Sequence, residues 1–167
     1  MAAAGPQRDR DEAGRARNAR PRDALGRPLP RDAAGEPTAP DDLSVTPEEA
    51  LRTAQQLLDS GRPFHAHEVL EAAWKTAAPP ERDLWQGLAQ LAVGITHARR
   101  GNARGAAALL RRAAARLDGY AGTTPHGIDT AGLISSARAL AARLEAGGAA
   151  GVDPAGLAVR LQIDPGR

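Results

Sequence analysis

Between residues 47 and 146, large apolar residues return every three or four positions, and the spacing is interrupted only at glycine and proline. Such spacing places side chains on one face of an α-helix. No run alternates apolar and polar residues with the period of two that is typical of strands. The sequence therefore predicts an all-α fold. The interruptions fall at Gly61 and Pro63, at Pro79-Pro80, at Gly101-Asn102 and in the stretch 119–129.

The helix boundaries are marked by capping residues. Thr46 can cap the first free amides, Pro47 suits the first helical position, and Glu49 completes a capping box. We expect a compact bundle of five or six helices, built from helical hairpins around a long central third helix. The expected ranges are 47–59, 63–76, 81–100, 103–117 and 130–146, with a short sixth helix from Asp153-Pro154 to Leu161.

The N-terminal stretch differs in composition from the rest of the chain. Its large apolar residues before Asp42 are only Met1, Leu25 and Leu29, so it cannot bury enough surface to offset the entropy of ordering. An Arg-Asp-x-x-Gly pattern recurs within it. The pattern begins at Arg10, at Arg22 and at Arg31. We predict a disordered Arg/Pro/Gly-rich arm over 1–43, an α-helical domain over 44–146 and a tail over 147–167.

Composition excludes several classes of protein. The chain has no cysteine, which rules out disulfides and thiolate metal sites. Its net charge is only +2, so no strong overall field favours nucleic acid. The first residues lack an apolar signal region and no apolar run is long enough to span a bilayer. We therefore predict a cytoplasmic protein that does not contact a membrane.

Polar residues occupy helix faces that should be buried. On the second helix His67 and Glu71 share a face with Leu70 and Trp74, and ionisable groups are costly there unless paired. Polar residues on the third helix can supply the partners. The candidate polar site comprises His67, Glu68, Glu71, Trp74, Trp85, Gln86, Gln90 and His97.

Two motifs carry a family resemblance. Residues 66–74 read A-H-E-x-x-E-x-x-W and residues 85–90 read W-Q-G-L-x-Q. The region 50–117 resembles the bacterial domain-of-unknown-function 309 family. The resemblance implies a small helical domain without an established biochemical activity. It places the family's motif residues on Ala66, His67, Glu68, Glu71, Trp74, Gln86, Gly87 and Gln90.

Three interpretations of the polar site remain open. In the first, Glu71 accepts a hydrogen bond from His67 or from the Trp85 indole, and the glutamines complete a buried network in a non-enzymatic interaction or structural module that binds a protein partner. In the second, His67 and Glu71 bind a divalent metal, with His97, His65 or Glu68 completing the shell. In the third, a buried Glu71 serves acid–base chemistry in a hydrolase-like enzyme. No catalytic residue can be assigned.

Arginines suggest a further function. The arm and the fourth helix are rich in arginine, which is the pattern of a nucleic-acid-binding surface, although a solvated tail and a solvated helix face explain it more simply. Nucleic acid is therefore an alternative partner that we do not favour. The candidate basic patch comprises Arg100, Arg104, Arg111 and Arg112.

Overall fold

The computed structural model describes residues 20–37 and 44–166, and within them it shows an all-α fold. No β-strand occurs in these residues, which contain only two isolated β-bridges. The prediction of fold class is therefore confirmed. The α-helices are α1 (Pro47–Asp59), α2 (Pro63–Thr76), α3 (Arg82–Arg99), α4 (Ala103–Leu117) and α5 (Thr130–Gly147).

The first helix begins at the predicted capping box. The Glu49 backbone N–H donates to Thr46 Oγ1 at 3.2 Å, and the Thr46 backbone N–H donates to a Glu49 carboxylate oxygen at 3.0 Å. Pro47 occupies the first turn, where no backbone donor is needed. Local chemistry alone thus fixes where the ordered helical region starts.

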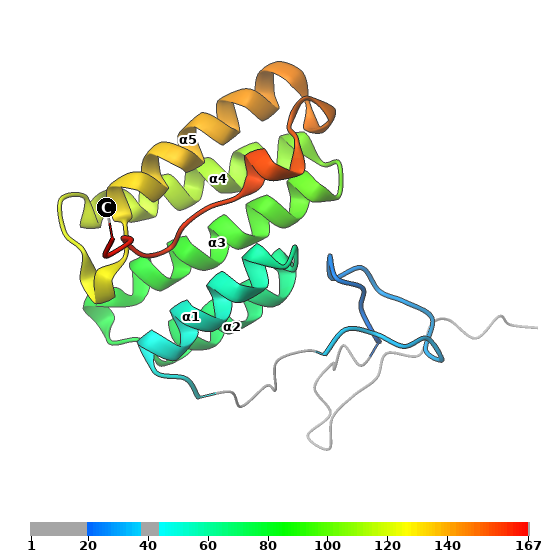
Figure 1. Ribbon diagram of the computed structural model, residues 1–167, viewed down its shortest axis with the longest axis horizontal. Coiled ribbons are helices and arrows are strands. Elements are labelled where there is room, and N and C mark those ends of the chain that lie inside the picture. Colours follow the sequence, from blue (N-terminus) through cyan, green and yellow to red (C-terminus); the bar gives the residue numbers. More distant parts are fainter. Residues whose placement is uncertain (1–19, 38–43, 167) are drawn as a thin grey trace, which may run out of the picture.

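Successive helices run antiparallel to one another (Figure 1). Helix α3 packs against α2 on one side and α4 on the other, while α1 packs on α2 and α5 on α4. The beginning of α2 and the end of α3 consequently lie at the same end of the bundle. This arrangement brings residues near 64 close to residues near 100.

Two glycines on α3 allow α4 to approach closely. A Cβ atom at Gly87 would lie 3.1 Å from side-chain atoms of Leu117, and one at Gly94 would lie 2.9 Å from Cγ of Leu110. Both distances are shorter than ordinary carbon contacts, so side chains larger than hydrogen do not fit without movement.

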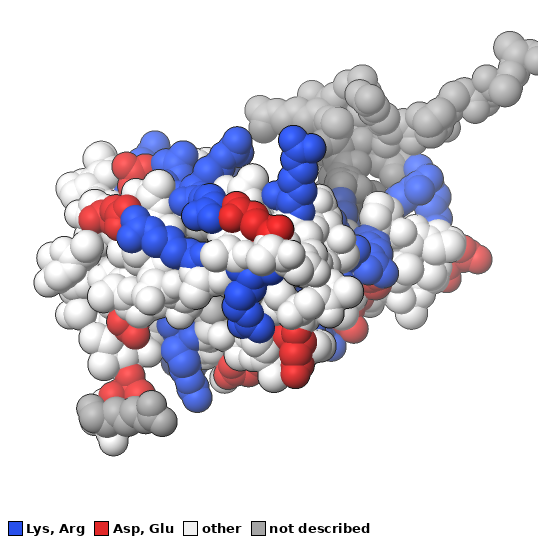
Figure 2. All heavy atoms as spheres, turned by 90° about the horizontal axis from the view of Figure 1, so that it is seen from above, with Lys and Arg blue, Asp and Glu red and all other residues white. Residues whose placement is uncertain are grey.

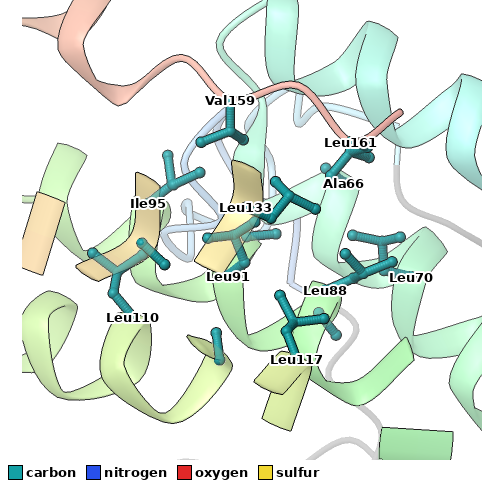
Figure 3. Packing of buried hydrophobic residues seen from close by; sticks show 14 of the residues in the cluster. Ala66, Leu70, Leu88, Leu91, Ile95, Leu110, Leu117, Leu133, Val159 and Leu161 are labelled. Atoms are coloured by element: carbon teal, nitrogen blue, oxygen red, sulfur yellow. The ribbon is translucent and has the colours of Figure 1, made fainter. Parts of the chain in front are cut away.

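The C-terminal segment packs into the core, although we had assigned 147–167 to a tail outside the domain. Val159 and Leu161 are 8% and 1% exposed, and both point into the cluster that contains Leu133 (Figure 3). The side chain of Gln55 holds this segment, since its Nε2 donates to the Val159 carbonyl at 3.0 Å and its Oε1 accepts from Leu161 N at 2.8 Å.

The expected sixth helix is only a 3₁₀ turn, Pro154–Leu157. After it the chain becomes extended, with ψ of 132° at Ala158. Extended backbone places Val159 and Leu161 on one side and exposes Arg160 between them, which a helix could not do. Tertiary burial therefore overrides the local helix signal at Asp153-Pro154.

The predicted arm is described in part. Residues 20–37 form a short hairpin with an isolated bridge between Arg22 and Pro28, whereas 1–19 and 38–43 lie outside the described residues. None of the described helices has the length and apolar character required to cross a bilayer.

Helix α3 should be sensitive to side-chain size at Gly94. We predict that Gly94→Val lowers the free energy of unfolding by about 1–3 kcal/mol, because the added methyl groups would overlap Leu110. Urea denaturation followed by circular dichroism measures the change. Gly147→Val is the matched control, since a Cβ atom at Gly147 has no neighbour within 4 Å among the described residues. Equal losses in both variants would contradict the close approach of α3 and α4.

Candidate functional site

The predicted polar site contains one of the two contacts expected for Glu71. His67 Nε2 lies 3.5 Å from Glu71 Oε2, one helical turn away on α2, and Lys75 Nζ lies 3.7 Å from the other carboxylate oxygen. The Trp85 indole does not join them, because its Nε1 donates to Glu81 at 3.2 Å. The His67–Glu71 pair is partly exposed, with side-chain exposures of 23% and 36%.

Burial dominates the electrostatics of His67. Its pKa is lowered from the usual value, chiefly because burial penalises the charged imidazolium, while the nearby carboxylates of Glu71 and Glu68 partly oppose the shift. The Nδ1 atom of His67 is buried without a hydrogen-bond partner among the described residues. The neutral imidazole is therefore favoured in the folded protein.

The remaining members of the predicted site lie in different surroundings. Gln90 Oε1 accepts from Arg116 Nε at 3.2 Å, and His97 Nδ1 lies 2.9 Å from the Asn102 side-chain amide nitrogen. Trp74 packs against the edge of the core, and Gln86 is half-buried. Among the described residues, the contact of His67 with Glu71 and the hydrogen bonds of Trp85, Gln90 and His97 thus lie at separate places on α2 and α3.

A second ionisable cluster, which the sequence had not indicated, lies at the other end of α3. The Glu81 carboxylate accepts from His126 Nε2 at 2.9 Å as well as from Trp85, and the rings of Trp85 and His126 are 5.9 Å apart. These two hydrogen bonds lower the pKa of Glu81. Because His126 comes from the loop before α5, only the tertiary fold brings the three residues together.

The histidine that α2 buries most completely is His65. It is 4% exposed, and neither ring nitrogen has a hydrogen-bond partner among the described residues. Its ring meets the Phe64 ring edge-on at 5.6 Å. His67, which had been expected on the buried face, is only half-buried, so the buried stripe of α2 is rotated relative to the predicted one.

The described residues contain no group of three or more histidine, aspartate or glutamate side chains arranged to hold a metal ion. His67 and Glu71 remain a pair of adjacent donors. Among the described residues, the predicted metal site therefore consists of these two donors.

The predicted basic patch is divided by local partners. Arg111 pairs with Glu145 of α5 at 2.5 Å, and Arg100 donates to a backbone carbonyl of the N-terminal hairpin. Arg104 and Arg112 are exposed on α4. Acidic side chains lie beside basic ones over the face shown in Figure 2. This mixture of charge weakens the field that would attract a polyanion.

The N-terminal hairpin docks on the ring of Phe64, close to His65 and His67. The guanidinium carbon of Arg22 lies 5.2 Å from the centre of the ring, within the range of a cation–π contact. Gly26 packs against the same ring, so closely that a Cβ atom there would lie 2.2 Å from Phe64 Cγ. The hairpin therefore covers Phe64, an aromatic residue that the bundle leaves partly outside its core.

Two arginines of the helical domain fix the hairpin by polar contacts. Arg100 Nε donates to the Leu25 carbonyl at 2.9 Å, and Nη2 donates to the same oxygen. Arg62 pairs with Glu36 at 2.7 Å. We call Arg62, Phe64 and Arg100 the Phe64 surface.

Sequence reasoning missed this surface although one signal was present. The Arg-Asp-x-x-Gly pattern at 22–26 supplies the Arg and Gly that touch Phe64. Nothing in the sequence near Phe64 or Arg100 indicated that these two residues lie together. Their proximity follows from the antiparallel pairing of α2 and α3.

The geometry defines a small all-α domain with a hairpin docked at one end. Residues 51–109 match the family described as Domain of unknown function (DUF309). This segment, which runs from α1 into α4, is similar to that family, and the predicted resemblance is confirmed over it. Comparisons with curated proteins and with solved structures gave no match. The Phe64 surface lies within the matched segment, whereas the hairpin precedes it.

His67 should make stability depend on pH near neutrality. Its folded-state pKa is below the unfolded value of about 6.5, so the unfolded chain takes up the proton first as pH falls. We predict that the free energy of unfolding falls below about pH 6.5, by at most about 1.4 kcal/mol per pH unit, until His67 itself is protonated. Urea denaturation between pH 5 and 8 measures this slope.

A His67→Gln variant should show a smaller slope over the same range, because glutamine does not titrate. Above about pH 7.5 the difference in stability between the two proteins should be constant, since the imidazole is then neutral in both states. Parallel curves across the whole range would contradict the role of His67.

Proposed function

We propose that this domain is a non-enzymatic interaction module and that the Phe64 surface is its binding site. The observation that carries the proposal is the docked hairpin. The surface receives it through a cation–π contact, a backbone carbonyl hydrogen bond and an ion pair. An aromatic residue flanked by arginines is the composition typical of binding hot spots.

The hairpin contacts the domain at its surface, as a ligand does, and is not part of the hydrophobic core. Every residue of the hydrophobic cluster, including those packed on its edge, lies between Val45 and Leu161. The hairpin contributes none of them. Its removal would therefore expose the Phe64 ring and two arginines but would leave the core intact.

Limited trypsin digestion of the full chain tests the docking. Trypsin cleaves after arginine unless proline follows, so within 20–37 it can cut after Arg22 and after Arg31 but not after Arg20 or Arg27. Arg22 is engaged with Phe64, whereas Arg31 is exposed. We predict that Phe64→Ala and Arg100→Ala accelerate cleavage after Arg22 about tenfold, equivalent to about 1.4 kcal/mol of lost docking energy. Mass spectrometry of the early fragments gives both rates.

Arg104→Ala is the matched control. Arg104 is an exposed arginine close in sequence to Arg100, and it makes no ion pair with the described residues, so its removal should leave cleavage after Arg22 unchanged. If wild type were cut after Arg22 as readily as the Phe64→Ala variant, the binding proposal would fail.

A metal-dependent, hydrolase-like enzyme is a second candidate, supported by the 3.5 Å separation of His67 Nε2 and Glu71 Oε2. Two tetrahedral ligands at zinc distances lie about 3.4 Å apart, so both atoms can bind one ion. A divalent metal held there would polarise a substrate carbonyl or activate water. The described residues supply no third ligand group, and for this reason we place the candidate second.

Elemental analysis of the purified, untagged protein separates the two candidates. We predict less than about 0.1 mole of zinc, manganese or iron per mole of chain, since two protein ligands hold such ions weakly. The enzyme would instead be favoured by one equivalent of metal in the wild type that is absent from both His67→Ala and Glu71→Ala. Thermal melts must show that both variants are folded.

A further inference from the structure

A pocket of about 340 Å³ lies where the C-terminal segment passes over the ends of α1 and α3 (Figure 1). Three parts of the chain that are distant in sequence form its walls: the last residues of α1, the C-terminal end of α3 and residues 154–159. Small-molecule sites have volumes from about 300 Å³ upwards, so this pocket has the size of such a site.

The lining of the pocket is mostly aliphatic. Ile95, Leu157 and Val159 are buried side chains of this lining, and Figure 3 shows Ile95 beside Val159. Two charged residues complete the set, Asp59 at the end of α1 and Arg99 at the end of α3. A small number of polar groups in an otherwise apolar pocket is the composition typical of ligand sites.

Arg99 is a cation without an anionic partner among the described residues. Its Nε atom is buried and has no hydrogen-bond partner there, and no described acidic side chain forms an ion pair with it. Asp59 instead accepts from Gln55 Nε2 at 2.8 Å. Buried donors are nearly always paired, because an unpaired one loses its hydrogen bonds to water without replacement.

The position of the guanidinium explains how the charge is tolerated. A Cβ atom at Gly61, just after α1, would lie 3.5 Å from Arg99 Nη1, so the guanidinium lies beside the C-terminal end of that helix. The negative end of a helix dipole favours a cation. It offsets part of the charge but leaves Nε without an acceptor. An anion in the pocket would supply that acceptor.

We propose that this pocket binds a small aliphatic monocarboxylate. The hydrocarbon chain lies along Ile95, Leu157 and Val159, and the carboxylate pairs with Arg99. A planar guanidinium presents parallel N–H donors that match the two oxygens of a carboxylate, and rotation of the side chain aims them into the pocket. Since the ligand would contact both α3 and the C-terminal segment, its binding holds this segment on the bundle.

Hexanoate is the ligand to use in the first experiment, a titration of the full chain followed by the NMR signals of its methyl groups. We expect a dissociation constant of about 1 mM, which is reasonable for so small a ligand. The methyl signals of Ile95, Leu157 and Val159 should shift, whereas those of Ile163, which is exposed and outside the pocket, should not. Absence of binding at about 10 mM hexanoate, or equal shifts at Ile163, would overturn the proposal.

Two related molecules separate the role of the charge from the role of the chain. We expect 1-hexanol, which keeps the chain but has no charge, to bind about tenfold more weakly than hexanoate. Acetate keeps the charge but lacks the chain and should not shift the pocket signals at about 10 mM. If 1-hexanol bound as tightly as hexanoate, the pairing with Arg99 would be wrong.

Arg99→Gln should weaken hexanoate binding about tenfold while leaving the affinity for 1-hexanol unchanged. The hexanol titration distinguishes loss of the pairing from distortion of the pocket, and equal weakening of both ligands would overturn the pairing. Arg104→Gln is the matched control, because Arg104 is an exposed arginine outside the pocket, and it should change neither affinity.

A variant that fills the pocket tests its location. Ala155 lines the pocket from the C-terminal segment and is exposed, so Ala155→Leu should block binding of both ligands without disturbing the core. Thermal melts check that the variant is folded. Undiminished binding of hexanoate to the folded Ala155→Leu variant would show that the ligand binds elsewhere and would overturn the proposal.

Discussion

Close approach of α3 to its neighbours is the constraint on which the rest of the structure depends. The chain has few large apolar residues, and 13 of the 32 buried hydrophobic residues in its described part are alanines. Small side chains bury little area each, so the helices must lie close enough for their backbones to share contacts. Gly87 and Gly94 permit this between α3 and α4. The C-terminal segment then adds Val159 and Leu161, which supply larger side chains over the other side of α3.

Local signals were sufficient to predict most of the helical architecture. The capping box at Thr46, Pro63 at the start of α2 and Asn102 before α4 act within a few residues of where they lie, so the sequence contains the whole interaction. The C-terminal segment could not be predicted in this way. Its conformation depends on Gln55, more than 100 residues earlier, whose amide group holds both Val159 and Leu161. The helix-start signal at Pro154 is local, so it does not reveal that the distant Gln55 amide favours an extended backbone at Val159 and Leu161.

The candidate site shows the same division between local and tertiary information. The His67–Glu71 contact spans one turn of one helix and was predictable from spacing alone. Contacts between helices were not, because a small rotation of α2 exchanges the buried positions: His65 is buried and His67 is only half-buried. Trp85 donates to Glu81 four residues earlier, which is a local contact, whereas His126 of a distant loop reaches the same carboxylate only through the tertiary fold. Helical periodicity shows that a helix has a buried face, but it does not determine which of several neighbouring residues lies on that face.

Arg100 connects the fold to the function that we propose. It ends α3, and its fork of donors holds the Leu25 carbonyl while its guanidinium lies 5.9 Å from the Phe64 ring. A backbone carbonyl is present in any sequence, so this contact gives affinity without selectivity, whereas the ring of Phe64 excludes any side chain at position 26. Selectivity therefore comes from apolar contact and affinity from a charge-assisted hydrogen bond. Because the antiparallel pairing of α2 and α3 places both groups at one end of the bundle, the helical packing itself creates the surface on which the hairpin docks.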